Sequence, residues 1–148
     1  MQVRALDGYY LVRLETGDEV QTALKSLARR ERIGFAALYG IGAFQRVTLG
    51  YFDDEAKSYR TRTLEEQVEV LSLSGNISRG EDGGVVAHIH VVVGRADYHL
   101  LGGHLVEAVV RPTLEVVVTT LPTTVQRRQD PATGLQLWDL GASPPVYV

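Results

Sequence analysis

Residues 85–94, VVAHIHVVVG, are the segment that most restricts how this chain can fold. Side chains alternate between the two faces of a β-strand, so every second residue shares an environment. The residues on one face are all apolar: Val85, Ala87, Ile89, Val91 and Val93. This pattern predicts a strand with one face buried against a hydrophobic core, as in an antiparallel sheet that is covered on one side.

The opposite face of the same strand carries His88 and His90. The rise of a strand separates their Cα atoms by roughly 6–7 Å, so both imidazoles can converge on one atom, as metal ligation requires. The Gly/Asp-rich stretches at 81–84 and 95–97 have the composition of turns. The second turn would return the chain antiparallel and bring residues 98–105 beside the histidine strand.

His104, which follows two glycines, is the natural third ligand on that returning strand. Glycine leaves room for the close approach of another backbone or of a ligand. Three histidines with one position left open would suit a divalent metal such as zinc. The alternative is that the histidines are hydrogen-bonded within the sheet or at a subunit contact. His99 lies five residues before His104, hence on the opposite face of a regular strand, although a bulge at the two glycines would change that parity.

One helix is clearly indicated within residues 18–34, DEVQTALKSLARRERIG. Asp18 is predicted to be its N-cap, with Gln21 at the spacing of a capping box, and Gly34 is its predicted end. Helical spacing gathers the apolar residues into one stripe: Val20, Ala23, Leu24, Leu27 and Ala28.

Most of the remaining chain is predicted to be strand, because short β-branched and aromatic runs alternate with Gly/Asp turns. One helix cannot connect so many strands in parallel βαβ units. We therefore predict an α+β fold: an antiparallel sheet of about seven or eight strands with one main helix packed on it. The predicted strands are residues 9–14, 35–41, 46–53, 58–64, 68–78, 85–94, 98–106 and 113–121.

Composition limits the chemistry that the chain can perform. Its 148 residues fit a single domain over 1–148, with a core of about 10–121 and a tail over 122–148 that has the pattern of a loop and a short strand. The absence of cysteine leaves histidine and carboxylate as possible metal ligands. A net charge of −3 gives no general attraction to nucleic acid. Since neither a signal peptide nor a membrane span is recognisable, we expect a cytoplasmic protein.

Four stretches occur in a specific order: LYGIGAFQRVTLGYFD, EEQVEVLSLSGNIS, AHIHVVVGRADYHLLGGHLVEAVV and TLEVVV. Together they resemble the plant and prokaryote conserved (PPC) domain, which plant AT-hook nuclear proteins carry beside their DNA-binding hooks. The resemblance runs from about residue 10 to residue 121. It implies an antiparallel sheet with one helix that assembles as a homotrimer, and a metal site at His88, His90 and His104.

Stand-alone bacterial and archaeal members of that family are commonly labelled as DNA-binding proteins. The Arg-Gly-Arg-Pro hook of the plant proteins is absent here. The resemblance therefore implies a DNA-associated or regulatory interaction module, whose partner is DNA or a protein and not a membrane. The alternative is an enzyme that uses a metal, zinc being the best candidate, at an open three-histidine site on a small-molecule substrate. The sequence identifies no catalytic residue; Glu69 and Glu107 are the only candidates for a general base.

Overall fold

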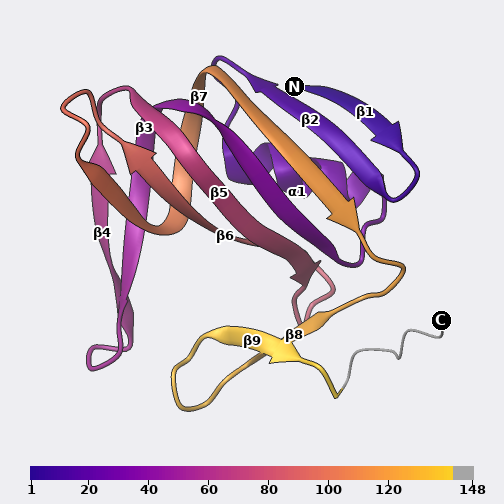
Figure 1. Cartoon of the computed structure of the whole chain (residues 1–148). Helices are drawn as coiled ribbons and strands as arrows, with labels where there is room; N and C mark the ends of the chain where they lie inside the picture. The colour runs from indigo at the N-terminus through magenta and orange to yellow at the C-terminus, as the bar shows by residue number, and fades with distance from the viewer. Residues whose placement is uncertain (142–148) are drawn as a thin grey trace.

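The computed structural model describes residues 1–141, which form one helix and a nine-stranded sheet (Figure 1). In chain order the elements are β1 (Gln2–Leu6), β2 (Tyr9–Glu15), α1 (Val20–Arg30), β3 (Ala36–Asp53), β4 (Ser58–Leu64), β5 (Val68–Arg79), β6 (Val85–Gly94), β7 (Leu100–Thr120), β8 (Gln126–Gln129) and β9 (Gln136–Asp139).

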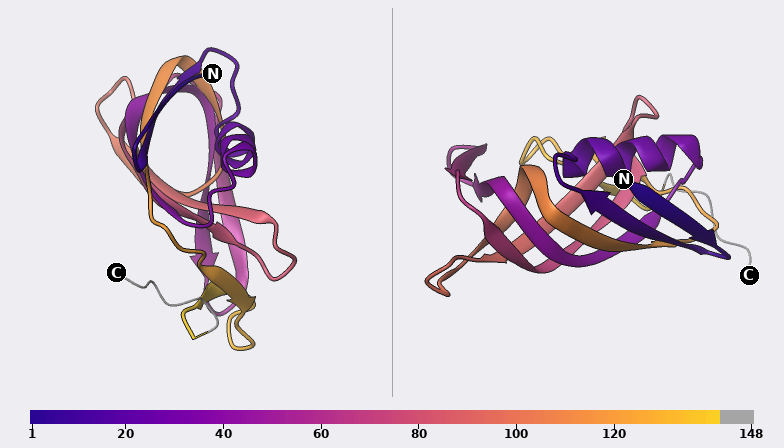
Figure 2. Two further views of the ribbon diagram at one scale, coloured as in Figure 1. Left: turned by 90° about the vertical axis from the view of Figure 1, so that its right-hand side faces the viewer. Right: turned by 90° about the horizontal axis from the view of Figure 1, so that it is seen from above.

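The sheet is antiparallel except where β5 meets β8 in parallel, at the pair Arg79 and Gln126. Its main path runs β1-β2-β7-β3-β5-β8-β9, with β4 added to β3 and β6 joined to both β5 and β7. Because β6 links β5 to β7, and β7 pairs with β3, these strands bend into a strongly curved sheet (Figure 2). The predicted class, a largely antiparallel sheet with one helix, is confirmed, with nine strands in residues 1–141 rather than seven or eight.

Strands β3 and β7 each correct the sequence prediction, which divided them in two. Both strands continue through irregular stretches where the pairing shifts, and one such shift in β3 lies between Gly40 and Gly42. The backbone of Gly42 has a φ of 155° and lies so close to the Thr113 carbonyl that a side chain would not fit. Glycine here therefore bends a continuous strand as a bulge instead of ending it. Strand β1 was not predicted.

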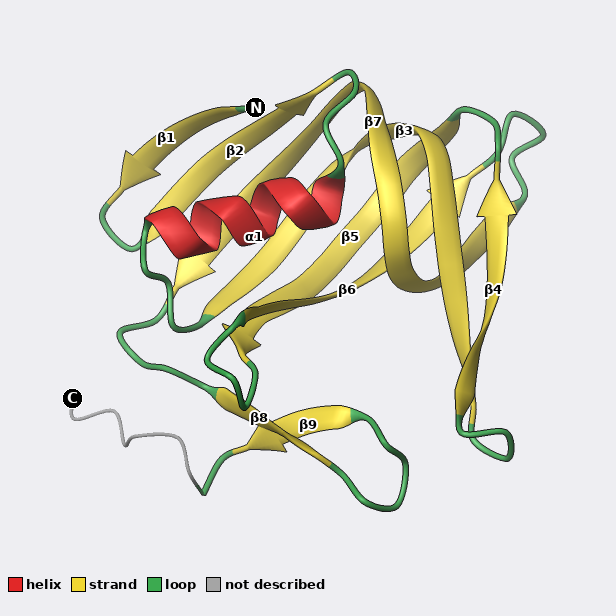
Figure 3. Cartoon of the chain, turned by 180° about the vertical axis from the view of Figure 1, so that it is seen from behind, coloured by secondary structure: helices red, strands yellow, loops and turns green. Residues whose placement is uncertain are grey.

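Helix α1 lies across one face of the sheet (Figure 3). The predicted apolar stripe is confirmed, since Val20, Leu24, Leu27 and Ala28 are buried. The predicted boundaries are wrong. The N-cap is Glu19, whose carboxylate accepts hydrogen bonds from the backbone amides of Gln21 and Thr22. Asp18 instead accepts from the backbone amide of Glu15, and the helix ends at Arg30.

The hydrophobic core lies between α1 and the inner face of the sheet. The five apolar residues predicted for the inner face of β6 are all buried. They pack with the buried helix residues and with large side chains from the neighbouring strands, among them Phe44, Leu73 and Leu105. Burial of these surfaces provides the main driving force that holds the helix on the sheet. None of the helices within residues 1–141 is both long enough and apolar enough to span a bilayer.

The predicted C-terminal tail contains a hairpin formed by β8 and β9, which lies at one end of the sheet (Figure 1). The ring of Trp138, in β9, contacts the ring of Phe35 in an edge-to-face arrangement. The hairpin therefore packs against the rest of its own chain.

Candidate metal centre

His88 and His90 lie on the outward face of β6, opposite the buried apolar face. Their Nε2 atoms are 3.2 Å apart. Pairing with β5 fixes the strand, since His88 lies opposite Asn76 and His90 lies opposite Ser74. The same alternation that buries one face of β6 thus holds the two imidazoles side by side.

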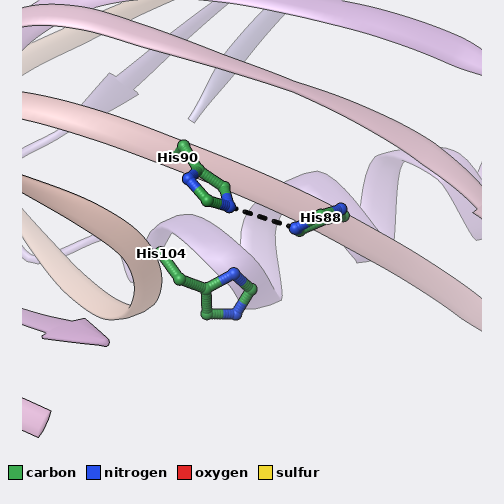
Figure 4. Close-up of side chains that lie close together, drawn as sticks. All are labelled: His88, His90 and His104. Atoms are coloured by element: carbon green, nitrogen blue, oxygen red, sulfur yellow. Dashed lines mark hydrogen bonds between the residues drawn. The ribbon is translucent and has the colours of Figure 1, made fainter. Parts of the chain in front are cut away.

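His104 joins them from β7, where it is the direct cross-strand partner of His90. Its ring centroid is 5.3 Å from that of His88 and 5.5 Å from that of His90. One ligand nitrogen from each of the three rings falls within 4.8 Å of the others. Figure 4 shows a ring nitrogen of His104 on the side that faces the other two histidines. The turn at 95–97 and the antiparallel return were therefore predicted correctly.

The donor set fits a divalent metal. Two nitrogens bound to zinc at 2.0–2.1 Å in tetrahedral geometry are about 3.3 Å apart, close to the spacing between the Nε2 atoms of His88 and His90. The Nδ1 atom of His104 is buried and has no hydrogen-bond partner. A buried polar atom without a partner is unfavourable, and a metal ligated there would satisfy it. The group contains no Asp, Glu or Cys from the part of the chain that the structure describes.

Both partly buried histidines favour the neutral form that ligates metals. Burial is the main cause that lowers the pKa of His88 from 6.5 to about 4, and the nearby charges of Arg127, His104 and His90 add to it. Burial also lowers the pKa of His104, with a further contribution from His90. At neutral pH, protons would therefore not compete with a metal for these two rings.

Arg127 reaches the site from β8, and sequence analysis did not identify it. Its side chain is 5% exposed. The guanidinium donates from Nε to Ser78 Oγ at 2.7 Å and from Nη2 to Asn76 Oδ1 at 2.9 Å, and Nη2 lies 3.4 Å from His88 Nδ1. Burial lowers the pKa of Arg127.

Tyr59 of β4 forms an aromatic wall next to His104. The two ring centroids are 5.0 Å apart. Gly50 provides the space for this contact, because a Cβ at that position would lie 2.9 Å from the Tyr59 ring. His90 is exposed, so the cluster can be reached from solvent.

The other candidate residues lie away from the cluster. The side chain of His99 is 82% exposed and contacts Asp97. Glu107 is paired with Arg46 and also accepts from the hydroxyl of Thr48. Glu69 is the partner of Gly94, at the far end of β6 from His88. Neither carboxylate is therefore placed to serve as a general base beside the three histidines.

The family model described as the Plants and Prokaryotes Conserved (PCC) domain matches residues 2–122 of this sequence. This is the family that the sequence motifs resemble. The match begins earlier than predicted because it includes β1. A search of curated proteins gives no match.

Three solved structures are similar over nearly their whole length. A "putative DNA binding protein" from Bacteroides thetaiotaomicron is 32% identical, with a TM-score of 0.90 over 95% of this chain and 97% of that one. A metal-containing protein from Archaeoglobus fulgidus is 36% identical, with a TM-score of 0.82 over 93% and 94%. A plant- and prokaryote-conserved protein from Pyrococcus horikoshii is 32% identical, with a TM-score of 0.82 over 93% of each chain.

Proposed function

The chain belongs to the Plants and Prokaryotes Conserved (PCC) domain family, and from this premise we propose that it is a metal-binding, DNA-associated or regulatory interaction module that works as a homotrimer. The observation that carries the metal site is the convergence of His88, His90 and His104 within 4.8 Å, together with the unpartnered buried Nδ1 of His104. A similar protein, from Archaeoglobus fulgidus, is named as metal-containing.

Zinc is the metal that we propose for this site. It binds neutral imidazoles in tetrahedral geometry, and the lowered pKa values of His88 and His104 keep these rings neutral at pH 7. Other imidazole-binding divalent metals would compete according to their availability. His88, His90 and His104 would hold and orient the ion, and the ring of Tyr59 packs against that of His104.

An exposed apolar area on the outer face of the sheet supports the proposed trimer. Four large apolar side chains on the neighbouring strands β2, β7 and β3 are each more than a third exposed: Leu11, Tyr39, Ile41 and Val117. They line a hollow of about 570 Å³. Contiguous apolar surface of this kind marks protein contacts more often than free surface. We propose that another copy of the chain covers it.

The DNA association is proposed from the name of the similar Bacteroides protein. The net charge of −3 means that any direct contact needs a local basic patch, which three subunits would present three times. Gel-shift titration at low and moderate salt tests this part. Binding that weakens steeply with salt is expected, and no binding at low salt would overturn it.

A metal-dependent enzyme is the second candidate, favoured by the three-ligand character of the site. The described residues provide three ligands and no fourth, the arrangement of catalytic rather than structural zinc. A zinc ion with an open position supplies a Lewis acid for a small substrate. The substrate would bind between the exposed His90 and the Tyr59 wall.

Elemental analysis of the purified, untagged and dialysed protein tests the metal proposal. We expect about one zinc or similar ion per chain, as a three-histidine site requires. The variant with both His88→Ala and His90→Ala should contain none, while its native mass should remain that of a trimer. A metal-free parent protein would overturn the metal site, and a parent that is monomeric at micromolar concentration would overturn the assembly.

A further inference from the structure

We propose that the β8–β9 hairpin is part of the histidine site, and that Arg127 makes this site select a small carboxylate ligand. The inference rests on the proposed metal site and names the class of ligand that the site takes. Residues 126–139 lie beyond the residues that the family model matches, so the hairpin lies outside the matched family domain.

Within residues 1–141, the buried guanidinium of Arg127 has only neutral hydrogen-bond partners. They are Ser78 Oγ, the Gln136 carbonyl and Asn76 Oδ1, and the nearest ring nitrogen is that of His88. The Trp138 ring lies 5.9 Å from the guanidinium carbon and covers it. A buried cation is costly unless an opposite charge accompanies it, and no carboxylate is among these partners.

The same imbalance extends across His88 to the metal position. One imidazole ring separates the guanidinium from the Nε2 atom that faces His90. The three histidines are neutral donors, and no Asp or Glu of the described residues joins their group. A divalent ion there would therefore place a second, larger positive charge beside Arg127, and none of the groups that residues 1–141 place around the two is an anion that could balance them.

A small anion that enters the site would provide the missing negative charge. A carboxylate oxygen is a good ligand for zinc. Solvent and a small anion can reach the site because His90 is exposed. The guanidinium is not needed to hold the hairpin in place, because the contact between Trp138 and Phe35 already packs the hairpin against the rest of the chain.

The test measures ligand binding on protein loaded with Co²⁺, whose visible absorption reports ligands at the metal. Acetate is the anionic probe and imidazole is the neutral one. The variant Arg127→Gln removes the charge. The variant Asn76→Asp keeps Arg127 and its hydrogen bond but adds a carboxylate where Asn76 Oδ1 lies 2.9 Å from Nη2, so it neutralises the cation without creating a cavity.

We expect both variants to weaken acetate binding about tenfold and to change imidazole binding less than about twofold, as loss of one nearby charge predicts. Equal losses for the two probes, or no loss, would overturn the role of Arg127. If Arg127→Gln does not fold, the isosteric Asn76→Asp decides the question by the same two affinities. Failure of the wild-type protein to bind Co²⁺ would overturn the proposed metal site instead, so the two failures are distinguishable.

Discussion

The two faces of β6 differ in what they contribute to the protein: one face stabilises the fold, and the other carries the histidine cluster. On the inner face Ile89 is fully buried in the core, whereas on the outer face His90 is exposed beside His88 and His104. The inner face contributes the general burial of apolar surface, for which any well-packed neighbour suffices. The metal site proposed for the outer face would need particular atoms from other strands at particular distances. A residue that stabilises the core, Ile89, and a residue of the proposed site, His90, are thus neighbours in the sequence.

Truncation on the inner face should have the largest effect on folding. Ile89→Ala removes a fully buried side chain and should lower the free energy of unfolding by about 2–5 kcal/mol. Val92→Ala is the matched control on the outer face, where the side chain is 39% exposed, and should cost less than about 1 kcal/mol. Urea unfolding of the metal-free proteins measures both. Similar losses would contradict the division between the faces.

Removal of a ligand should affect metal binding and leave the core intact. His104→Gln removes one of the three proposed ligand nitrogens and should reduce zinc affinity more than about 100-fold. Changing a group that only orients a ligand typically costs about 10–100-fold, so loss of a ligand itself should exceed that range. His99→Gln is the control on the same hairpin, since that side chain is exposed and outside the cluster. Competition with a chromophoric chelator gives the affinities. A normal affinity for His104→Gln would exclude this residue as a ligand.

The cap of α1 tests whether the helix side is independent of the site. Glu19→Ala removes hydrogen bonds to the amides of Gln21 and Thr22 and should cost about 1 kcal/mol of unfolding free energy, with no change in metal content. Burial raises the pKa of Glu19, but hydrogen bonds from Thr22, Gln21 and Ala108 outweigh it and lower the pKa below 4.5. The stabilisation is therefore present above pH 4.5 and is lost as the pH falls through the folded-state value. Thermal unfolding at pH 7 and pH 3 should show a smaller difference between wild type and variant at pH 3.

The pH dependence of the metal-free protein tests the outer face without any bound ion. His88 and His104 have lowered pKa values in the folded protein, so the unfolded chain binds protons more readily than the folded one below pH 6.5. Stability should therefore fall from pH 6.5 towards pH 4, and the variant with both His88→Ala and His104→Ala should lose less. Urea midpoints at pH 7 and pH 5 measure this. A rise in stability on acidification would show that these rings are charged in the folded state.

The sequence predicted the contacts that follow from alternation and from short turns. The buried face of β6, the pair His88 and His90, and their meeting with His104 all depend on one strand and one hairpin. The carboxylates Glu69 and Glu107 were considered as general bases because of their residue type, and the register of β5, β6 and β7 places both elsewhere.

The features that the sequence did not predict depend mostly on contacts between residues that are far apart in the chain. Strand β3 continues through Gly40 and Gly42, and β7 through Pro112, because their neighbours pair on both sides of each irregularity. Arg127 reaches the site through the single parallel contact between β5 and β8, and its sequence neighbours do not distinguish it from a surface arginine. Trp138, which covers the guanidinium, is eleven residues further along the chain, so only the hairpin brings the two together. The N-cap was missed by one residue because Asp18 and Glu19 are both suitable acceptors.

The direct pairing of His90 with His104 restricts how this gene can change in length. A strand that slips by one residue turns all its side chains to the opposite face. Insertion of one residue between Leu100 and Gly103 would therefore send His104 into the core and bring an apolar neighbour out, whereas insertions in the exposed turn at 95–98 would leave the pairing intact. Homologous sequences that keep the three histidines should accordingly vary in length at that turn and not within the paired strands.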